Sequence, residues 1–364
     1  MQAPATERES FSTATEGVID ADIHNDLPSR ETLLTYLPAR WRRHHELMSG
    51  RSGRPGSYYP RSITGNARTD SWPPSGLPPG ADLPFLREQL LDRYNIGCGI
   101  LNPFVGIGGH QDIEYGAALA RAANDWLIAE WLDPEPRLRA SIVVQYEDGE
   151  LAAEEIDRVG EHPGFVQVLI LSRTCEPLGR RKYWKIYEAA ERHGLPIGIH
   201  FGGTGSGPIT SVGWASYYIE DHVGASQVMQ SQLISLVCEG IFERFPGLRV
   251  ALIEGGFAWL PPLMWRLDRA WEKLCEEVPL VRRAPSEYIR EHVRLTTQPM
   301  EEPTNPRHFL KALEHMGSED LLMFATDYPH WDFDAPDLAF PIRLPEVLQR
   351  KILVENARAF YRLP

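Results

Sequence analysis

The 364-residue sequence contains little cysteine, and its cysteines show no pattern. Cys98, Cys175, Cys238 and Cys275 are scattered along the chain without a CxxC pair. Such spacing argues against a zinc knuckle and against a disulfide framework. We therefore expect reduced thiols.

Basic residues are also scarce relative to acidic ones. There are 37 Lys and Arg residues against 50 Asp and Glu, which gives a formal net charge of -13. The basic clusters, Arg40–His45 and Arg180–Lys182, are short and typical of solvated faces. Because a nucleic-acid partner requires a concentrated basic surface, we expect none.

Long apolar runs are missing too. No segment reaches the roughly 20 apolar residues that a membrane-spanning helix needs. The opening stretch MQAPATERESFSTATEG is polar and lacks the apolar core of a signal peptide. We expect a soluble, cytoplasmic protein with a small-molecule substrate and no membrane partner.

Short apolar runs, in contrast, recur along the whole chain, and each is associated with a segment of helical periodicity. The runs are Val18–His24, Ile96–Asn102, Ala140–Gln145, Phe165–Leu171, Ile197–His200, Val250–Glu254, Val293–Thr297 and Leu322–Asp327. The helical segments are Pro84–Arg93, Asp112–Trp131, Asp148–Gly160, Lys182–His193, Asp221–Phe245, Phe257–Glu277, Pro306–His315 and Pro345–Tyr361. This alternation predicts parallel strands joined by crossover helices, and eight such pairs favour a single (β/α)8 (TIM) barrel domain over residues 1–364.

One connection is too long for this pattern. Residues 25–84 follow the first strand and are dense in Gly, Pro, Ser and Arg from Ser49 to Pro84. Because this insertion leaves the C-terminal end of a strand, we expect it to cap the barrel mouth. The aromatic residues Tyr58, Tyr59 and Trp72, with the stretch Leu34–Trp41, favour an ordered cap.

Polar residues end three of the predicted strands. Asp22 and His24 lie on one side of the first strand, His200 ends the fifth, and Asp327 ends the eighth. Each alone has an ordinary explanation: a polar strand end, a hydrogen-bonded histidine or a turn cap. All strand ends of a barrel meet at its mouth, however, and burying these groups together without a cation is costly. We predict one divalent metal held by these four residues; without a thiolate the set suits Zn²⁺ first, with Mn²⁺ or Fe²⁺ as alternatives.

This arrangement resembles the amidohydrolase superfamily, most closely the amidohydrolase-related branch with aminocarboxymuconate-semialdehyde decarboxylase and the resorcylate and dihydroxybenzoate decarboxylases. The similar motifs are Asp-x-His at Asp22, His200 after GLPIGI, FPGLRV before the sixth strand, and TDYPH around Asp327. The resemblance extends from Asp20 to the C-terminal helix. It implies that the four predicted ligands bind a single metal, and, since relatives commonly dimerise, it leaves a homodimer open.

One residue departs from that family's pattern. The family usually has a histidine at the end of strand six, in a motif like HGG, whereas this sequence reads LIEGG with Glu254 there. A carboxylate with an ordinary pKa of about 4.3 is a base near neutral pH unless burial raises that pKa. Glu254 is therefore a candidate acid, base or ligand. The alternative is that it only accepts hydrogen bonds from the next helix or from a ligand histidine.

Further candidates lie close to these strand ends. His330 follows Asp327 by three residues and is a candidate catalytic residue, although it could instead cap its loop. We predict that substrate is bound by Asn102 and Gln298, at the ends of strands two and seven, and by Tyr218 and His222, after strand five. Aromatic residues in such loops also commonly serve packing.

Three functions follow from this set. The first is a metal-dependent hydrolase of a small, aromatic or cyclic substrate, in which metal-activated water attacks and Asp327, or else Glu254, takes the proton. The second is a non-oxidative decarboxylase of an aromatic or unsaturated acid, ranked lower because the strand-six histidine is missing. The third is a metal- or ligand-binding barrel without catalytic activity.

Overall fold

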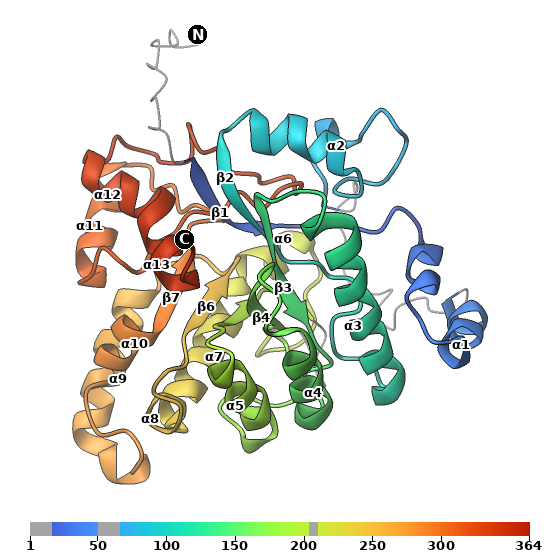
Figure 1. Ribbon diagram of the computed structural model, residues 1–364. Helices are drawn as coiled ribbons and strands as arrows, with labels where there is room; N and C mark the ends of the chain where they lie inside the picture. Colours follow the sequence, from blue (N-terminus) through green and yellow to red (C-terminus); the bar gives the residue numbers. More distant parts are fainter. Residues whose placement is uncertain (1–16, 50–65, 204–209) are drawn as a thin grey trace, which may run out of the picture.

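The computed structural model describes residues 17–49, 66–203 and 210–364, and its centre is an eight-stranded parallel barrel (Figure 1). The strands follow one another around the sheet in sequence order. They are β1 (Val18–Ile23), β2 (Ile96–Leu101), β3 (Leu138–Val143), β4 (Phe165–Leu171), β5 (Ile197–His200), β6 (Val250–Ile253), β7 (Val293–Thr296) and β8 (Leu322–Met323). The predicted barrel is confirmed.

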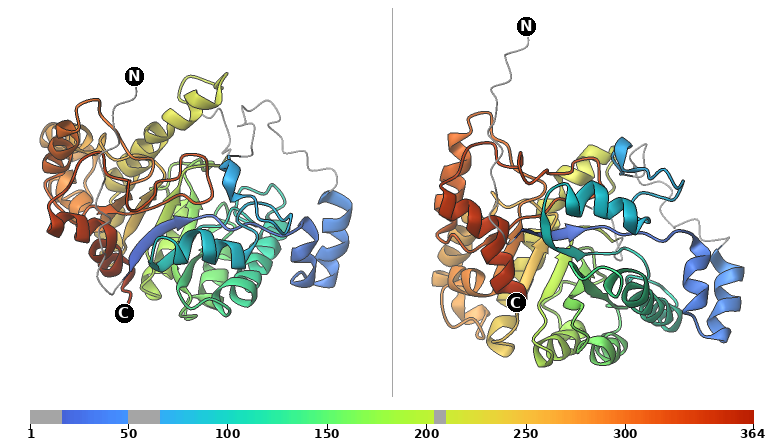
Figure 2. Two further views of the ribbon diagram at one scale, coloured as in Figure 1. Left: turned by 90° about the horizontal axis from the view of Figure 1, so that it is seen from above. Right: turned by 45° about the horizontal axis from the view of Figure 1, so that its top comes forward.

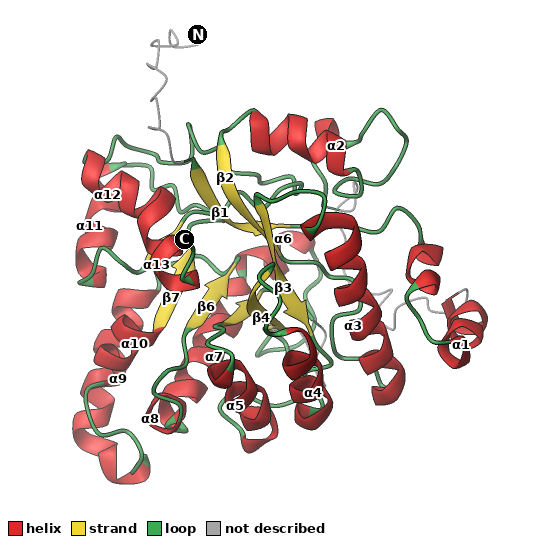
Figure 3. Ribbon diagram, in the orientation of Figure 1, coloured by secondary structure: helices red, strands yellow, loops and turns green. Residues whose placement is uncertain are grey.

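Helices surround these strands, as Figure 3 shows in red around yellow. They are α1 (Ala39–Ser49), α2 (Leu83–Leu86), α3 (Ile113–Leu127), α4 (Gly149–Val159), α5 (Trp184–Arg192), α6 (Tyr218–Val223), α7 (Ala225–Cys238), α8 (Ile241–Arg244), α9 (Leu260–Leu274), α10 (Pro285–His292), α11 (Arg307–Met316), α12 (Glu346–Arg350) and α13 (Asn356–Tyr361). Shorter 3₁₀ segments are η1 (Arg30–Thr35), η2 (Thr69–Ser71), η5 (Arg181–Tyr183) and η6 (Cys275–Glu277), and π-helical turns are η3 (Arg87–Asp92), η4 (Ile128–Leu132) and η7 (Lys351–Glu355).

The helices differ from the prediction on either side of β6. The segment expected as one helix over Asp221–Phe245 is α6, α7 and α8, which are separated at Gly224 and Gly240. Gly240 has a left-handed backbone (φ 69°), a conformation that glycine adopts without steric cost. Helix α10 before β7 was not predicted.

The barrel closes between β1 and the segment after β8. The eighth strand was expected to reach Asp327 but ends at Met323, and the chain continues beside β1 through separate hydrogen bonds. The Ala21 N–H donates to the Phe324 carbonyl (2.9 Å), and the Asp327 N–H donates to the Asp22 carbonyl (3.1 Å). These bonds place the two predicted carboxylate ligands on neighbouring backbone.

The described part of the insertion contacts two different regions. Its helical part packs on the outer layer, where the Tyr36 hydroxyl donates to Glu130 (2.9 Å), and α1 lies beside α3 at the edge of the molecule (Figure 2). Farther along, the Arg68 N–H donates to the Pro329 carbonyl in the loop after β8 (2.9 Å). Trp72 is 54% exposed. Tyr58 and Tyr59 lie outside the described residues, and the cap over residues 25–84 stays a prediction.

Two other expectations concern the whole chain. All four cysteines are free, in agreement with the prediction of reduced thiols. Within the described ranges, no helix has both the length and the apolar character that crossing a bilayer would require.

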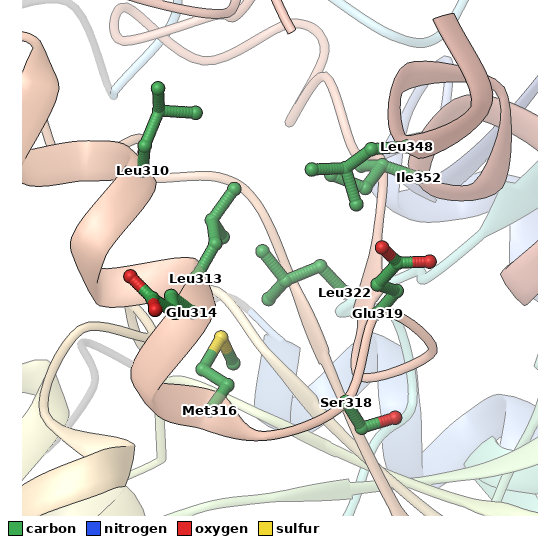
Figure 4. Close-up of a pocket in the computed structure, with 9 residues that line it drawn as sticks. All are labelled: Leu310, Leu313, Glu314, Met316, Ser318, Glu319, Leu322, Leu348 and Ile352. Atoms are coloured by element: carbon green, nitrogen blue, oxygen red, sulfur yellow. The ribbon is translucent and has the colours of Figure 1, made fainter. Parts of the chain in front are cut away.

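A pocket lies between α11 and the α12–η7 segment (Figure 4). It is lined by Leu310, Leu313, Glu314, Met316, Ser318, Glu319, Leu322, Leu348 and Ile352. These side chains come from α11, the loop after it, the start of β8 and the α12–η7 segment, and none of them is a predicted site residue. The pocket is a gap in the packing of the outer layer.

Candidate metal centre

Six ionisable side chains gather where the strands end at the barrel mouth. The ligand atoms of His24, Glu254, Asp327 and His330 all lie within 4.8 Å of one another, and so do those of Asp22, His24 and His200. The structure therefore brings the four residues predicted as ligands together with Glu254 and His330. Such a cluster could hold a metal ion.

His24 is oriented with one ring nitrogen toward the cluster. Its Nδ1 lies 2.7 Å from the Asn102 carbonyl, so Nδ1 carries the proton, and Nε2 faces Asp327 Oδ1 at 3.0 Å. Both His24 Nε2 and Asp327 Oδ2 are buried and lack a hydrogen-bond partner. Buried polar atoms are seldom left unsatisfied. A cation between them would satisfy both.

His200 is oriented in the same way. Its Nδ1 donates to the Phe201 carbonyl (2.7 Å), which leaves Nε2 toward the carboxylates of Asp22 (3.2 Å) and Glu254 (3.4 Å). Ligand histidines commonly donate their other ring N–H to a carbonyl in this manner, which sets the tautomer for metal binding.

The buried charges of the cluster raise the pKa values of His24 and Glu254. Burial alone would lower the pKa of His24, but Asp22 and Asp327 outweigh it and raise that pKa to about 9. Burial raises the pKa of Glu254 well above its ordinary value, and the nearby Asp327 and Asp22 carboxylates raise it further. Without a cation His24 is therefore protonated, and a cation bound at its Nε2 would displace the proton from that nitrogen.

Glu254 and Asp327 share an uncommon backbone conformation. Their φ angles are 58° and 60°, in the left-handed region that residues other than glycine seldom adopt. The Glu254 N–H donates to Thr296 Oγ1 (3.0 Å), which supports this turn. Such conformations are often found at functional sites. Here they direct both carboxylates into the mouth.

Asn102 lies beneath the cluster rather than on its open side. It was predicted to bind substrate, but it is 0% exposed and its Nδ2 donates to Asp22 Oδ1 (2.8 Å). Its Oδ1 accepts hydrogen bonds from Ser141 Oγ (2.5 Å) and Gln167 Nε2 (2.9 Å). The Asn102 side-chain amide therefore forms its hydrogen bonds inside the barrel. Asn102 acts on the cluster through two contacts: its amide donates to Asp22, and its backbone carbonyl accepts from His24.

Three residues of this inner layer were missed from the sequence. Ser141 and Gln167 interrupt the apolar strands β3 and β4, a signal that polar side chains point into the barrel. Asp20 accepts hydrogen bonds from the N–H (2.9 Å) and hydroxyl (2.5 Å) of Thr326. Asp20 thereby joins β1 to the segment that carries Asp327.

The other three predicted substrate-binding residues meet around Asp332. Its Oδ2 lies 2.8 Å from Gln298 Nε2 and 2.8 Å from His222 Nε2. Beside this pair, Trp331 Nε1 donates to the Tyr218 hydroxyl (3.2 Å). These contacts join α6 to the loop after β8 at the mouth. Asp332 and Trp331 were not predicted.

Aromatic rings flank the ligands. Phe104, in the loop after β2, stacks on His24 with a centroid distance of 4.7 Å and contacts His200 edge-on at 4.9 Å. The His330 ring also stacks on His24 (4.5 Å), and its Nδ1 lies 2.7 Å from Asp327 Oδ1. Phe104 is 37% exposed, so the cluster has an apolar surface on its open side.

The fold and this cluster together define a class: parallel (β/α)8 barrels with a carboxylate and imidazole site for a cation at the C-terminal mouth. Comparison with known families gives the particular assignment. The family described as Amidohydrolase matches residues 19–363, so the chain belongs to the amidohydrolase family, as the sequence resemblance predicted.

Individual relatives narrow the chemistry. The chain is 26% identical over 310 residues to gamma-resorcylate decarboxylase of Polaromonas sp. strain JS666. The matched region covers 79% of this chain and 93% of that protein. Its fold is similar to that of a dihydroxybenzoic acid decarboxylase from the same strain with manganese and 2-nitroresorcinol (TM-score 0.64, 20% identity, 96% and 98% of the two chains). It is also similar to 5-carboxyvanillate decarboxylase of Novosphingobium aromaticivorans with manganese and 4-hydroxy-3-methoxy-5-nitrobenzoic acid (TM-score 0.70, 20% identity, 99% and 100%).

These relatives correct one ranking made from the sequence. Hydrolysis was placed first, but the relatives are named as decarboxylases and favour the alternative. Zinc was the first metal expected, whereas both of these solved structures contain manganese.

Proposed function

We propose that this protein is a manganese-dependent, non-oxidative decarboxylase of a hydroxylated aromatic carboxylic acid. The observation that carries the proposal is the buried cluster at the mouth, in which His24 Nε2 and Asp327 Oδ2 lack partners. The similarity to aromatic acid decarboxylases over most of the chain supports this reaction over hydrolysis.

The proposed ligands are Asp22, His24, His200 and Asp327. Two imidazoles and two carboxylates without a thiolate fit Mn²⁺, and Zn²⁺ and Fe²⁺ remain alternatives with the same donor atoms. When bound, the metal would anchor the substrate carboxylate and the adjacent hydroxyl and withdraw electron density from the ring.

Glu254 is the proposed proton donor. In the reaction the bond between the ring carbon and the carboxylate breaks, CO₂ leaves, and the ring carbon gains a proton. The Glu254 carboxyl is 8% exposed, and its Oε2 lies 3.4 Å from His200 Nε2, so it is within the cluster and shielded from bulk water. Burial, together with the nearby Asp327 and Asp22 carboxylates, raises the pKa of Glu254, and a carboxyl with a raised pKa can act as a general acid.

His330 has a supporting role in this proposal. Its Nδ1 is hydrogen-bonded to Asp327 Oδ1, so it orients that carboxylate and leaves Oδ2 for the cation. Phe104 stacks on His24 with one face and is 37% exposed, so its uncovered surface suits contact with an aromatic substrate.

The test is an assay of CO₂ release. Metal-free protein would be loaded separately with Mn²⁺, Zn²⁺ or Fe²⁺ and incubated with 2,6-dihydroxybenzoate or 5-carboxyvanillate in deuterated water. We expect CO₂ release and one deuteron on the carbon that lost the carboxylate. Hydrolysis of esters, lactones or amides without CO₂ release would favour the hydrolase instead, and no stoichiometric metal would favour the barrel without activity.

The oligomeric state is a separate proposal. We retain the homodimer expected from the family resemblance, and analytical ultracentrifugation tests it. Sedimentation at the 41.2 kDa mass of one chain would contradict it.

A further inference from the structure

Arg173 lies at the mouth beside the residues that follow His200. It comes directly after Ser172, whose N–H donates to the His200 carbonyl (2.7 Å). The Arg173 N–H in turn donates to the Gly202 carbonyl (3.0 Å). The backbone of Arg173 is thus held against the segment that leaves a proposed metal ligand.

The Arg173 side chain is buried, and one of its donors has no partner. Its side chain is 10% exposed, its Nη2 forms an ion pair with Asp221 of α6, and its Cζ lies 4.7 Å over the Phe201 ring. The Nε atom is buried and makes no hydrogen bond. Because burying an unsatisfied charged donor is costly, this N–H marks a position where an acceptor from outside the chain would be stabilised.

The guanidinium carries its charge at neutral pH. Burial lowers the pKa of Arg173 only to about 10. A planar guanidinium presents paired N–H donors that match the geometry of a carboxylate. Arg173 therefore offers a charged donor next to the proposed reaction centre.

The simpler explanation is an ion pair that only holds α6 in place. That role uses Nη2, and α6 is also joined to the loop after β8 by the Tyr218–Trp331 and His222–Asp332 hydrogen bonds. A lysine would serve equally well as the positive partner of Asp221. The unsatisfied Nε–H is the feature that a structural ion pair does not explain.

We propose that Arg173 is a specificity-determining residue that binds a second anionic substituent on the substrate ring, separate from the carboxylate lost as CO₂. The substrate class is then a hydroxylated aromatic diacid. This proposal rests on the decarboxylation proposed above, because that reaction places the substrate ring at the metal. It adds that the ring carries a second anionic group, which Arg173 binds.

Binding of unreactive nitrophenols tests it. The manganese-loaded protein would be titrated with 2-nitrophenol and with 4-hydroxy-3-nitrobenzoate and 3-hydroxy-4-nitrobenzoate, which add one ring carboxylate at different positions. The variants are Arg173→Lys, which keeps a positive charge but has no Nε–H, and Arg173→Met. Arg180→Met is the control, because Arg180 is 58% exposed and pairs with Glu239 at 3.2 Å.

We expect the native protein to prefer a carboxylated ligand by at least about 10-fold, as a charge-assisted hydrogen bond would provide. Both Arg173 variants should weaken binding of that ligand by about 10- to 100-fold and binding of 2-nitrophenol by less than about 3-fold. Arg180→Met should change neither. Asp221→Asn should preserve the preference, because it removes an anion that competes for the guanidinium.

Other outcomes would overturn the proposal. Equal weakening of all ligands, or the same loss of preference in Asp221→Asn as in Arg173→Met, would mean that Arg173 only positions α6. Full retention of the preference in Arg173→Lys would exclude a role for Nε–H. The nitrophenols are not turned over, so their binding is measured independently of the reaction. If the carboxylated ligand is preferred but no substrate releases CO₂, the proposed decarboxylation is wrong and the Arg173 binding site stands.

Discussion

Asp327 is a proposed metal ligand and also has a left-handed backbone conformation. Its carboxylate has one oxygen 2.7 Å from His330 and the other buried without a partner. Asp327→Asn would keep the shape and one oxygen but lose the charge. We expect turnover to fall by at least about 10³-fold, since a charged group in the reaction centre is lost, while the circular dichroism spectrum stays unchanged. CO₂ release at the native rate would contradict the assignment.

Variants of Glu254 test the role of the residue at which this chain departs from the family pattern. Glu254→Gln keeps the size but cannot donate an acidic proton, and we expect a loss of about 10²- to 10⁴-fold in kcat, the range of general acid catalysis. Glu254→His restores the family's usual residue, which also tolerates the left-handed backbone. We expect it to retain more activity than Glu254→Gln. The pH dependence of kcat for the three proteins is the measurement, and equal rates in all of them would exclude proton donation by Glu254.

Asn102 acts on the cluster from behind. It donates to Asp22 Oδ1 and its carbonyl accepts the His24 proton. We expect Asn102→Ala to weaken metal affinity by about 10- to 100-fold, as loss of a residue that orients ligands commonly does. Ser141→Ala, one hydrogen bond farther away, is the matched control and should have a smaller effect. Calorimetric titration of metal-free protein with Mn²⁺ measures both, and unchanged affinity in Asn102→Ala would assign its amide to another role.

At the scale of elements, a buried ion-pair network joins the helical turn η3 to the start of β3. Glu135 is 4% exposed and lies 2.7 Å from Arg87 Nε and 2.9 Å from Arg137 Nε. The hydrogen bonds from Arg137 outweigh the effect of burial and, with those from Arg87, lower the pKa of Glu135 to about 2. The network therefore stabilises this edge of the barrel only while Glu135 is ionised.

This lowered pKa predicts a pH dependence of stability. A carboxyl whose pKa is lower in the folded than in the unfolded chain stabilises the fold above the unfolded pKa of about 4.5, and that contribution is lost as the pH falls toward about 2. We expect Glu135→Gln to lower the free energy of unfolding by about 1–2 kcal/mol at pH 7, since both arginines are partly exposed and screened, and by less at pH 3. Urea denaturation at both pH values is the measurement.

Glu188→Gln is the matched control, because Glu188 is 54% exposed and pairs with Lys185 at 3.4 Å. An exposed pair of this kind contributes roughly 0–1 kcal/mol. A loss in Glu135→Gln that is the same at pH 7 and pH 3 would show that ionisation of Glu135 does not stabilise the fold.

At the scale of the whole molecule, the metal should stabilise the barrel. The proposed ligands lie at the ends of β1 and β5 and in the segment after β8, so a bound ion would link distant parts of the chain in the folded state only. At a free Mn²⁺ concentration 100-fold above Kd, we expect a gain of about 2.7 kcal/mol in the free energy of unfolding. Calorimetry should show a higher Tm with Mn²⁺ than with chelator, and a smaller increase in Asp327→Asn. Equal Tm values with and without Mn²⁺ would argue against a site in the folded protein.

The barrel and the six clustered residues were accessible from the sequence because their signals are local. Each buried strand is an apolar run of a few residues, and a polar residue that interrupts such a run at its end is visible without knowledge of any other segment. The strand ends then meet because parallel strands in a barrel all point the same way. Asp22, His24, His200 and Asp327 could be brought together by that rule alone.

The inner support of these residues required the tertiary structure. Asn102 ends a strand like a substrate-binding residue, but whether its side chain faces the mouth or Asp22 depends on the stagger of β1 against β2. Thr326 and Asp20 are 306 residues apart, and Gln167 and Asn102 are 65 apart. No periodicity along the chain encodes such pairs.

By itself, the sequence determined the barrel and the strand ends that carry the proposed metal ligands, because both follow from local hydrophobic patterns. Only the tertiary structure decided that Glu254 enters the cluster, that Asn102 supports it from below and that Arg173 is buried with a free donor beside it. These positions depend on strand register, on the two left-handed turns and on packing between distant segments, and the local pattern of residues is the same whichever way those side chains point.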